Sequence, residues 1–344
     1  MQKCIFYTCA YNAEATLQRT ITSICTQTYK HWDYFIIDNG STDNTAKITE
    51  KFAKEDGRII LLKNEKNMVF KKENILANFG AKYNDDVFFC VLDSDDEYKP
   101  EFLEKMLDFA QANTLDVVSC GHDFVDALDG NITYTRVLEE NLILEGGGFS
   151  EHFTTYHQFM RTWWCKLFPL GIIRKSDLSR RPYVPYGGDT LYTQEMFRKS
   201  NRVGIMAESL HRYYLSPKSS SYRWNPRRVE ADRILNNTAR MFLTDKCGEV
   251  TPKNDEFLLK VYFNAIKDTI DVLLNAKIEL RQALEVLHNI LIYDETERMI
   301  SWQGFQPEKA ILFKRVAEWI SSQKGSMDGA NAEVTLEIYD AMGI

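Results

Sequence analysis

Two clusters of carboxylate side chains each follow a short apolar run in the N-terminal part of the chain. Asp38 follows residues 35–37, and segment 93–96, which reads Asp-Ser-Asp-Asp, follows residues 87–92. Such runs are typical of buried parallel strands, so both clusters are expected at the sheet edge where ligands bind. Carboxylates spaced as Asp-x-Asp supply the oxygen ligands that Mg²⁺ or Mn²⁺ prefers, and such a cation binds phosphate oxygens. The pattern therefore predicts a site for a nucleoside diphosphate and a divalent metal.

The elements that position these clusters alternate between strand and helix. Strands are expected at residues 4–8, 34–37, 58–62, 87–92 and 116–121, and helices at 14–27, 43–54, 72–83 and 100–112. This alternation indicates βαβ units. From about residue 225 onward, apolar residues recur at helical spacing. We therefore predict an α/β fold with a mostly parallel sheet flanked by helices in residues 1–224, and a smaller all-helical domain in residues 225–344.

The composition favours a globular protein of the cytoplasm. The net charge of −7 argues against nucleic acid or anionic lipid as a bulk partner. No apolar stretch approaches the roughly 20 residues that cross a bilayer, and the opening residues 1–8 are strand-like, so no signal peptide is expected. The seven cysteines contain no Cys-x-x-Cys pair, which favours reduced thiols over zinc or disulfide frameworks.

Four motifs, in a fixed order, resemble the family 2 glycosyltransferases of the GT-A fold. They are Thr8-Cys9-Ala10-Tyr11-Asn12-Ala13-Glu14, then Gln27-Thr28-Tyr29, then Asp38-Asn39-Gly40-Ser41-Thr42-Asp43-Asn44-Thr45, then Leu92-Asp93-Ser94-Asp95-Asp96. Each motif alone is weak, but four in order at strand ends are specific. The resemblance covers residues 3–125 strongly and continues more loosely to about residue 222. It implies a bacterial-type, inverting glycosyltransferase that uses a nucleotide-sugar donor, most often a UDP-sugar, with Mn²⁺ or Mg²⁺.

The resemblance also implies where the donor nucleotide lies. The residues expected to contact it are Thr8, Ala10, Tyr11, Asn12, Glu14, Asp38, Lys72, Asp93 and Ser94. Tyr11 would flank the base, and Asp38 would accept a hydrogen bond from the imide N–H of uracil. Asp93 would contact the ribose or the metal shell. Either Lys71 or Lys72 would replace the basic residue that the family carries near the phosphates.

The remaining roles fall on three residues. Asp95 would ligate the metal, and His211 would complete the metal shell or contact the diphosphate. Asp189 stands where the family carries the second residue of a Glu-Asp pair, so it would be the general base, although Gly188 replaces the usual Glu. A single base without an enzyme nucleophile gives one displacement, which inverts the anomeric carbon.

Other interpretations stay open at this point. Asp189 also suits a helix N-cap, His211 a packed core histidine, and the aromatic segment 163–164 either core or a sugar platform. A nucleotidyltransferase is disfavoured because residues 9–13 lack a Gly-rich loop with a Lys or Arg. A non-catalytic nucleotide- or glycan-binding relative is compatible with Gly188. The C-terminal helices could form a homodimer, bind the inner membrane surface from the cytosolic side, or hold a glycan, lipid-linked or peptide acceptor.

Overall fold

The structure, a computed structural model, describes residues 2–68, 82–177, 184–215 and 223–322. The chain divides into two compact units. The N-terminal unit consists of Met1–Pro182, Gly188–Pro217 and Phe242–Gly248, and the helical unit of Tyr183–Gly187, Lys218–Met241 and Glu249–Ile344. The predicted domain boundary at residues 224/225 remains a proposal.

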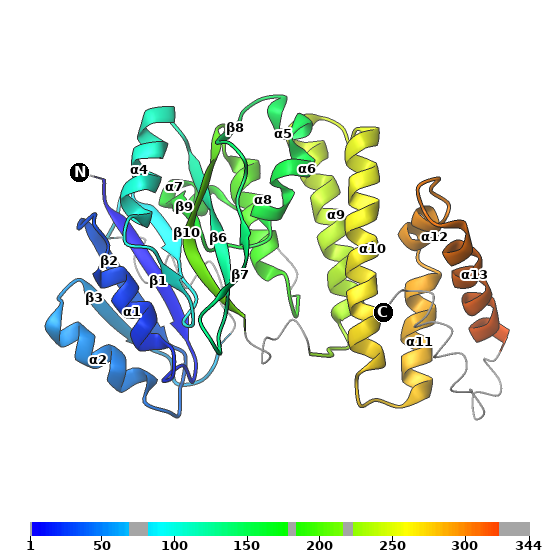
Figure 1. Ribbon diagram of the computed structural model, residues 1–344, viewed down its shortest axis with the longest axis horizontal. Helices are drawn as coiled ribbons and strands as arrows, with labels where there is room; N and C mark the ends of the chain where they lie inside the picture. The colour runs from blue at the N-terminus through cyan, green and yellow to red at the C-terminus, as the bar shows by residue number, and fades with distance from the viewer. Residues whose placement is uncertain (1, 69–81, 178–183, 216–222, 323–344) are drawn as a thin grey trace. The chain divides into compact units, whose positions relative to one another are not determined.

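The N-terminal unit is built on one sheet (Figure 1). Its strands are β1 Cys4–Ala10, β2 Trp32–Asp38, β3 Ile59–Lys63, β4 Phe88–Val91, β5 Glu97–Tyr98, β6 Val117–Asp126, β7 Ile132–Arg136, β8 Leu142–Leu144, β9 Lys166–Pro169 and β10 Val203–Leu215. The strand order is β3-β2-β1-β4-β9-β6-β10-β5, with β7 paired to β6 and β8 to β10. Strands β1 to β4 are parallel, as the βαβ pattern predicts. Because β9 runs antiparallel to both β4 and β6, the sheet as a whole is mixed.

Helices of the N-terminal unit follow the predicted alternation with shifted ends. They are α1 Leu17–Cys25, α2 Thr45–Glu55, α4 Phe102–Asn113, α5 Gly148–Glu151, α6 Phe153–Tyr156, the 3₁₀ helix His157–Met160, α7 Leu170–Lys175 and α8 Gly188–Lys199. Helix α1 begins three residues later than predicted because the preceding turn is bonded to the loop after β2. The helix predicted at residues 72–83 lies almost wholly outside the described residues.

A core of aromatic side chains holds α1 and α4 against one face of the sheet. Phe6 of β1 contacts Trp32 and Tyr98 with ring centroids 6.2 and 6.1 Å apart, and Tyr98 stacks on Phe102 at 3.7 Å. The Tyr98 hydroxyl also donates to the Val91 carbonyl at 2.6 Å. The core is thus bonded to the end of β4, where the second carboxylate cluster begins.

The helical unit confirms the all-helical prediction for the described part of the C-terminal region. It contains α10 Pro252–Leu274, α11 Leu280–Leu291, α12 Asp294–Ile300, α13 Pro307–Ser322 and the part of α9 Arg228–Cys247 that ends at Met241. Apolar side chains of α10, α11, α12 and α13, most of them leucine or isoleucine, form its core. Among the described helices of the whole chain, none has an apolar stretch long enough to cross a bilayer.

Two arginines and two carboxylates join three helices of this unit. Arg240 of α9 pairs with Asp255 of α10 and Glu295 of α12, and Arg298 of α12 pairs with the same two carboxylates. Each charge therefore has two partners of opposite sign. Such a closed network is a stronger constraint than isolated surface pairs, which are each worth about 0–1 kcal/mol.

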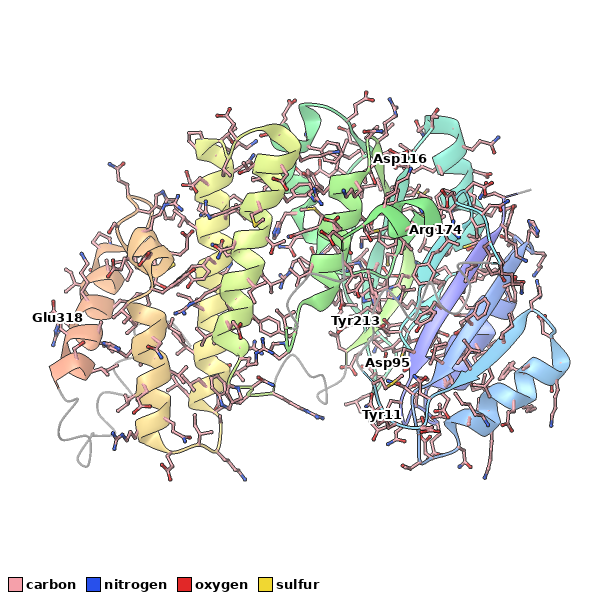
Figure 2. The ribbon with its side chains drawn as sticks, turned by 180° about the vertical axis from the view of Figure 1, so that it is seen from behind. Tyr11, Asp95, Asp116, Arg174, Tyr213 and Glu318 are labelled. Carbon is pink, nitrogen blue, oxygen red and sulfur yellow. The ribbon has the colours of Figure 1, made fainter. Side chains whose placement is uncertain are left out.

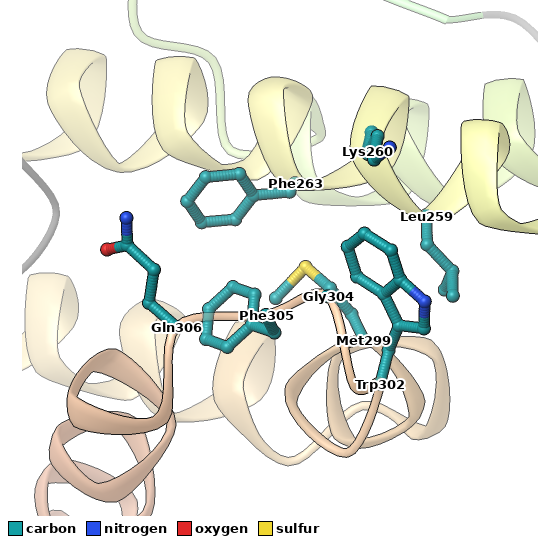
Figure 3. A pocket seen from close by; sticks show the side chains of 8 residues that line it. All are labelled: Leu259, Lys260, Phe263, Met299, Trp302, Gly304, Phe305 and Gln306. Atoms are coloured by element: carbon teal, nitrogen blue, oxygen red, sulfur yellow. The ribbon is translucent and has the colours of Figure 1, made fainter.

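A cavity of about 210 Å³ lies between α10 and the turn after α12 (Figure 3). It is lined by Leu259, Lys260, Phe263, Met299, Trp302, Gly304, Phe305 and Gln306. The Trp302 ring covers Gly304 so closely that a Cβ there would lie 2.1 Å from a ring atom. Residue 304 must therefore be glycine for this ring position.

Asp232 should make the stability of the helical unit depend on pH. It is buried on α9, where its Oδ2 accepts a hydrogen bond from Thr269 Oγ1 at 2.6 Å. Burial raises its pKa to about 8. Since this native pKa exceeds the unfolded value, the carboxyl group contributes most stability below the unfolded pKa of about 4, and the contribution falls as pH rises to 8. The loss approaches about 1.4 kcal/mol per pH unit over that interval.

Urea unfolding of the native chain and of Asp232→Asn between pH 5 and 9, followed by circular dichroism, measures this effect. The native chain should lose stability relative to the variant as pH rises, because the amide of Asn does not titrate. Parallel pH profiles for the two proteins would show that Asp232 is not the responsible group.

Candidate functional site

The loops that follow β1 and β2 are bonded to each other. The backbone N–H of Asn12 donates to Ser41 Oγ at 3.0 Å, and Asn12 Oδ1 accepts from the N–H of Thr42 at 2.9 Å. Glu14 Oε2 accepts from the N–H of Asn44 at 3.0 Å. Asn12 has a φ of +50°, which Asn tolerates better than most residues. Asn12 and Glu14, both predicted to contact the nucleotide, thus fix the shape of these two loops.

Thr8 faces the interior of the sheet. Its fully buried hydroxyl lies 2.8 Å from the Tyr34 hydroxyl and donates to the Leu92 carbonyl at 2.7 Å. It therefore ties β1 to the residue just before the second carboxylate cluster. Because side chains alternate between the two faces of a strand, Thr8 points to the same face as Phe6, which lies in the core.

Asp38 and Tyr11 lie where the first two strands end. Asp38 pairs with Ala10 across β1 and β2, and its Oδ1 accepts from the N–H of Ser41 at 3.1 Å. Its side chain is 5% exposed, whereas Tyr11 is 47% exposed. Figure 2 shows Tyr11 and Asp95 at the same end of the sheet. The structure thus places a buried carboxylate, an exposed aromatic ring and the second carboxylate cluster along one edge.

Within the second cluster the three carboxylates differ in exposure. Asp96 is fully buried; its Oδ1 accepts from the N–H of Tyr214 at 2.9 Å and its Oδ2 lies 3.3 Å from His211 Nε2. Asp93 is half-buried and Asp95 is exposed. His211 is itself fully buried, with its ring stacked on Trp164 at 4.7 Å. Asp95 is therefore the carboxylate of the cluster that is open to a ligand.

Burial raises the pKa of these carboxylates and of Asp189, and repulsion between carboxylates adds to the effect at Asp93 and Asp96. Desolvation, and then the charges of Asp96, Asp189 and Asp95, raise the pKa of Asp93 well above its usual range. Desolvation also raises the pKa of Asp189, whereas Lys166 acts to lower it. Asp189 lies in the first turn of α8, 96 positions beyond Asp93 in the numbering, yet it is close enough for its charge to raise the pKa of Asp93. The fold thus brings the predicted base to the carboxylate cluster.

A short segment before β9 connects the two sides of this site. Trp163 donates a side-chain hydrogen bond to Asp93. The carbonyls of Arg161 and Thr162 accept from the α8 hydroxyls of Thr190 at 3.0 Å and Thr193 at 2.7 Å. Segment 161–163 therefore fixes the start of α8, which carries Asp189, relative to Asp93.

These oxygen ligands fit a divalent metal of the Mg²⁺ or Mn²⁺ type. The charge of Asp95 is among those that raise the pKa of Asp93, and a bound cation would offset this repulsion. Among the described residues, no three His, Cys, Asp or Glu side chains form a ready metal site. Mg²⁺ is commonly held by one or two carboxylates together with substrate phosphates and water, so two carboxylates suffice in the presence of a diphosphate.

Two basic residues of the site, Lys166 and Arg19, are not predicted by any of the sequence motifs. Lys166 is buried, donates to Thr162 Oγ1 at 3.1 Å and to the Trp164 carbonyl at 3.0 Å, and has its pKa lowered to about 8 by burial. The sequence feature that could have indicated Lys166 is a single lysine within an aromatic and apolar run. Arg19 donates to the Asp95 carbonyl and lies 3.5 Å above the Tyr214 ring. No local pattern marks Arg19, and Lys72 lies outside the described residues.

The fold and site match known glycosyltransferases. The family model described as glycosyl transferase family 2 matches residues 6–176. An uncharacterized glycosyltransferase of Haemophilus influenzae is 28% identical over 271 residues, which cover 74% of this chain and 78% of that protein. WfgD of Escherichia coli, a UDP-Glc:alpha-D-GlcNAc-diphosphoundecaprenol beta-1,3-glucosyltransferase, is 29% identical over 141 residues, 40% of this chain and 54% of WfgD.

Among solved structures, residues 1–349 of S. aureus TarS in complex with UDP-GlcNAc give a TM-score of 0.68 at 16% identity, covering 100% of this chain and 92% of that one. At this identity the likeness shows a shared fold. The protein thus has a GT-A-type α/β fold. The chain belongs to glycosyl transferase family 2 and is a glycosyltransferase.

Proposed function

We propose that this glycosyltransferase moves a sugar from a UDP-sugar to a hydroxyl group of a glycan, lipid-linked or peptide acceptor, with inversion and with Mn²⁺ or Mg²⁺ at Asp95. The observation that carries the proposal is that segment 161–163 is bonded both to Asp93, in the loop after β4, and to the start of α8, which carries Asp189. Two relatives support the choice of donor: TarS was solved with UDP-GlcNAc, and the name of WfgD specifies UDP-Glc.

The chain's own groups have distinct roles in this proposal. Tyr11 presents an exposed ring to the base, and Asp38 accepts the imide N–H of uracil. The cation, when bound, neutralises negative charge on the departing diphosphate. Asp189 accepts the proton of the attacking hydroxyl, so the new bond forms opposite the leaving group. Lys166 opposes the rise in the Asp189 pKa and so favours the ionised base.

The other predicted contacts keep more limited roles. Ala10 and Ser94 flank the nucleotide from β1 and from the second cluster, and Lys72 remains a proposed phosphate contact. Ligation by His211 also remains a proposal, with its Nε2 beside the Asp96 carboxylate. For Lys72 and His211, the proposed partner is the diphosphate or the metal bound to it.

Thermal unfolding with nucleotides tests the donor site, and Asp38→Asn is the informative variant. We expect UDP with Mn²⁺ to stabilise the native chain more than CDP, GDP or ADP does. At a hundred times the dissociation constant, a ligand adds about 2.7 kcal/mol. Asp38→Asn should weaken UDP binding about 10- to 100-fold, because a hydrogen bond to a charged group contributes about 1.5–3 kcal/mol.

Asp38→Asn should also reduce the preference for UDP over CDP, since an amide can donate to the ring nitrogen that cytosine leaves unprotonated. Asp108→Asn, an exposed substitution on α4, serves as the control. If UDP and CDP stabilise the native chain equally, the role of Asp38 is wrong. If no nucleotide stabilises it with Mn²⁺ present, the donor site is not functional.

A further inference from the structure

One face of the sheet carries two rows of side chains that run across neighbouring strands. In the first row Arg136 of β7 pairs with His122 of β6, which pairs with His211 of β10. Two residues along each strand, and so on the same face, Tyr134, Phe124 and Tyr213 form the second row. Both rows lead from β7 toward the Asp96 loop, because His211 Nε2 lies 3.3 Å from Asp96 Oδ2.

The second row and Trp164 form a continuous series of aromatic contacts. Ring centroids are 5.7 Å apart for Tyr134 and Phe124, 5.7 Å for Phe124 and Tyr213, and 5.3 Å for Tyr213 and Trp164. Trp164 in turn stacks on His211. Tyr134 is 59% exposed, whereas His211 is fully buried. An aromatic surface, of the kind on which the apolar faces of sugar rings pack, thus extends from solvent toward the carboxylates.

Arg136 stands at the outer end of the first row without a carboxylate partner. It is half-buried, with its guanidinium carbon 5.1 Å from the centre of the Phe124 ring, and it forms no ion pair with any described residue. Burial, and then the charge of Arg161, lower its pKa. A partly buried guanidinium normally has a compensating anion.

Several other arginines around the sheet have carboxylate partners: Arg58, Arg174, Arg198 and Arg202 each pair with an Asp or Glu. Arg19 instead donates to the Asp95 carbonyl and lies over the Tyr214 ring. The position of Arg136 is also fixed by the backbone, since a Cβ on Gly121 of β6 would lie 2.4 Å from the Arg136 carbonyl oxygen. The backbone of Arg136 is therefore closely packed on β6, and its guanidinium lies over the Phe124 ring with no carboxylate partner among the described residues.

We propose that Arg136 binds an anionic group of the acceptor, a phosphate or a carboxylate, while the acceptor's sugar rings lie along Tyr134, Phe124 and Tyr213. The inference rests on the proposed function, because it takes the region of Asp93 and Asp189 as the place where the acceptor hydroxyl reacts. Arg136 lies two strand spacings, about 10 Å, from His211, so the anion belongs to a part of the acceptor away from the reacting hydroxyl. With a net charge of −7, the protein as a whole repels anions, which makes a local arginine necessary.

Saccharide binding to Arg136→Gln tests the inference, with Arg202→Gln as the matched control. Calorimetric titrations are run with UDP and Mn²⁺ present, so that the probes cannot occupy the donor site. The probes are neutral chitotetraose, a tetrasaccharide alternating N-acetylglucosamine with glucuronic acid, and a chitobiose phosphomonoester. We expect one anionic probe to bind the native chain at least about 10-fold more tightly than the neutral one. Arg136→Gln should remove this preference and Arg136→Lys should restore part of it, because guanidinium binds such anions bidentately and ammonium does not.

The choice of probe separates the two anions, since binding of the uronic acid assigns a carboxylate and binding of the phosphomonoester a phosphate. Equal affinity for neutral and anionic probes, no binding of either anionic probe, or an unchanged preference in Arg136→Gln would overturn the inference. Thermal stabilisation by UDP and Mn²⁺, measured on every variant, keeps the two proposals apart. If UDP and Mn²⁺ do not stabilise the native chain, the donor site is contradicted. If they do stabilise it, and Arg136→Gln keeps the native preference for an anionic saccharide, only the role of Arg136 is contradicted.

Discussion

Replacing Asp189 by Asn should reduce sugar transfer about 10²- to 10⁴-fold while UDP binding stays intact. A general base contributes a factor of this size, and an amide cannot accept the proton of the acceptor hydroxyl. The substitution preserves the size of the side chain at the start of α8, so the hydroxyl contacts of Thr190 and Thr193 should persist. The rate of UDP release with acceptor present, and thermal stabilisation by UDP with Mn²⁺, give the two readouts.

A purely structural role for Asp189 predicts a different result. A carboxylate in the first turn of a helix stabilises it by about 0.3–1 kcal/mol through the helix dipole, so its loss would lower stability slightly and leave turnover nearly unchanged. Asp108→Asn controls for removal of an acidic side chain elsewhere in the unit. Native-like transfer by Asp189→Asn would remove Asp189 as the base and favour the interpretation of a helix-terminal residue.

The parts of the site that could be predicted are those that depend on local sequence. Asp38 and Asp95 follow apolar runs directly, and a buried strand followed by a polar loop is readable within ten residues. The side-chain direction of Thr8 depends on strand register, which fixes it toward Tyr34 and Leu92. The inserted strand β9 depends on pairing with β4 and β6, far away in the chain, and no periodicity within residues 166–169 reveals it.

The same limit explains the missed basic residues and the link between the carboxylates. Lys166 reaches the site because β9 lies inside the sheet, and Arg19 because α1 packs beside the loop of Asp95. The bond from Trp163 to Asp93 joins residues 70 positions apart in the numbering. Sequence motifs therefore located the two carboxylate loops, whereas tertiary packing decides which groups surround them.

Asp95→Ala should abolish the dependence of UDP binding on Mn²⁺ and lower transfer by at least about 10²-fold. A bound cation contributes several kcal/mol to stabilising the charge of a leaving diphosphate, and Asp95 is the exposed carboxylate of its cluster. The metal-free variant should be as stable as the native chain or slightly more stable, because the charge of Asp95 raises the pKa of both Asp93 and Asp96 by repulsion. Thermal unfolding with and without Mn²⁺, UDP or both measures these effects.

Asp96→Ala separates this ligand role from a structural one. The Asp96 carboxylate is buried against the N–H of Tyr214 and His211 Nε2, and leaving a buried donor unsatisfied costs about 1–3 kcal/mol. Asp96→Ala should therefore lose stability without any ligand present, whereas Asp95→Ala should lose only the stabilisation that Mn²⁺ and UDP give together. If Asp95→Ala keeps a full response to Mn²⁺, the metal is held elsewhere. If Asp95→Ala is as unstable as Asp96→Ala without ligands, Asp95 supports the fold of the loop, and its carboxylate does not serve only as a metal ligand.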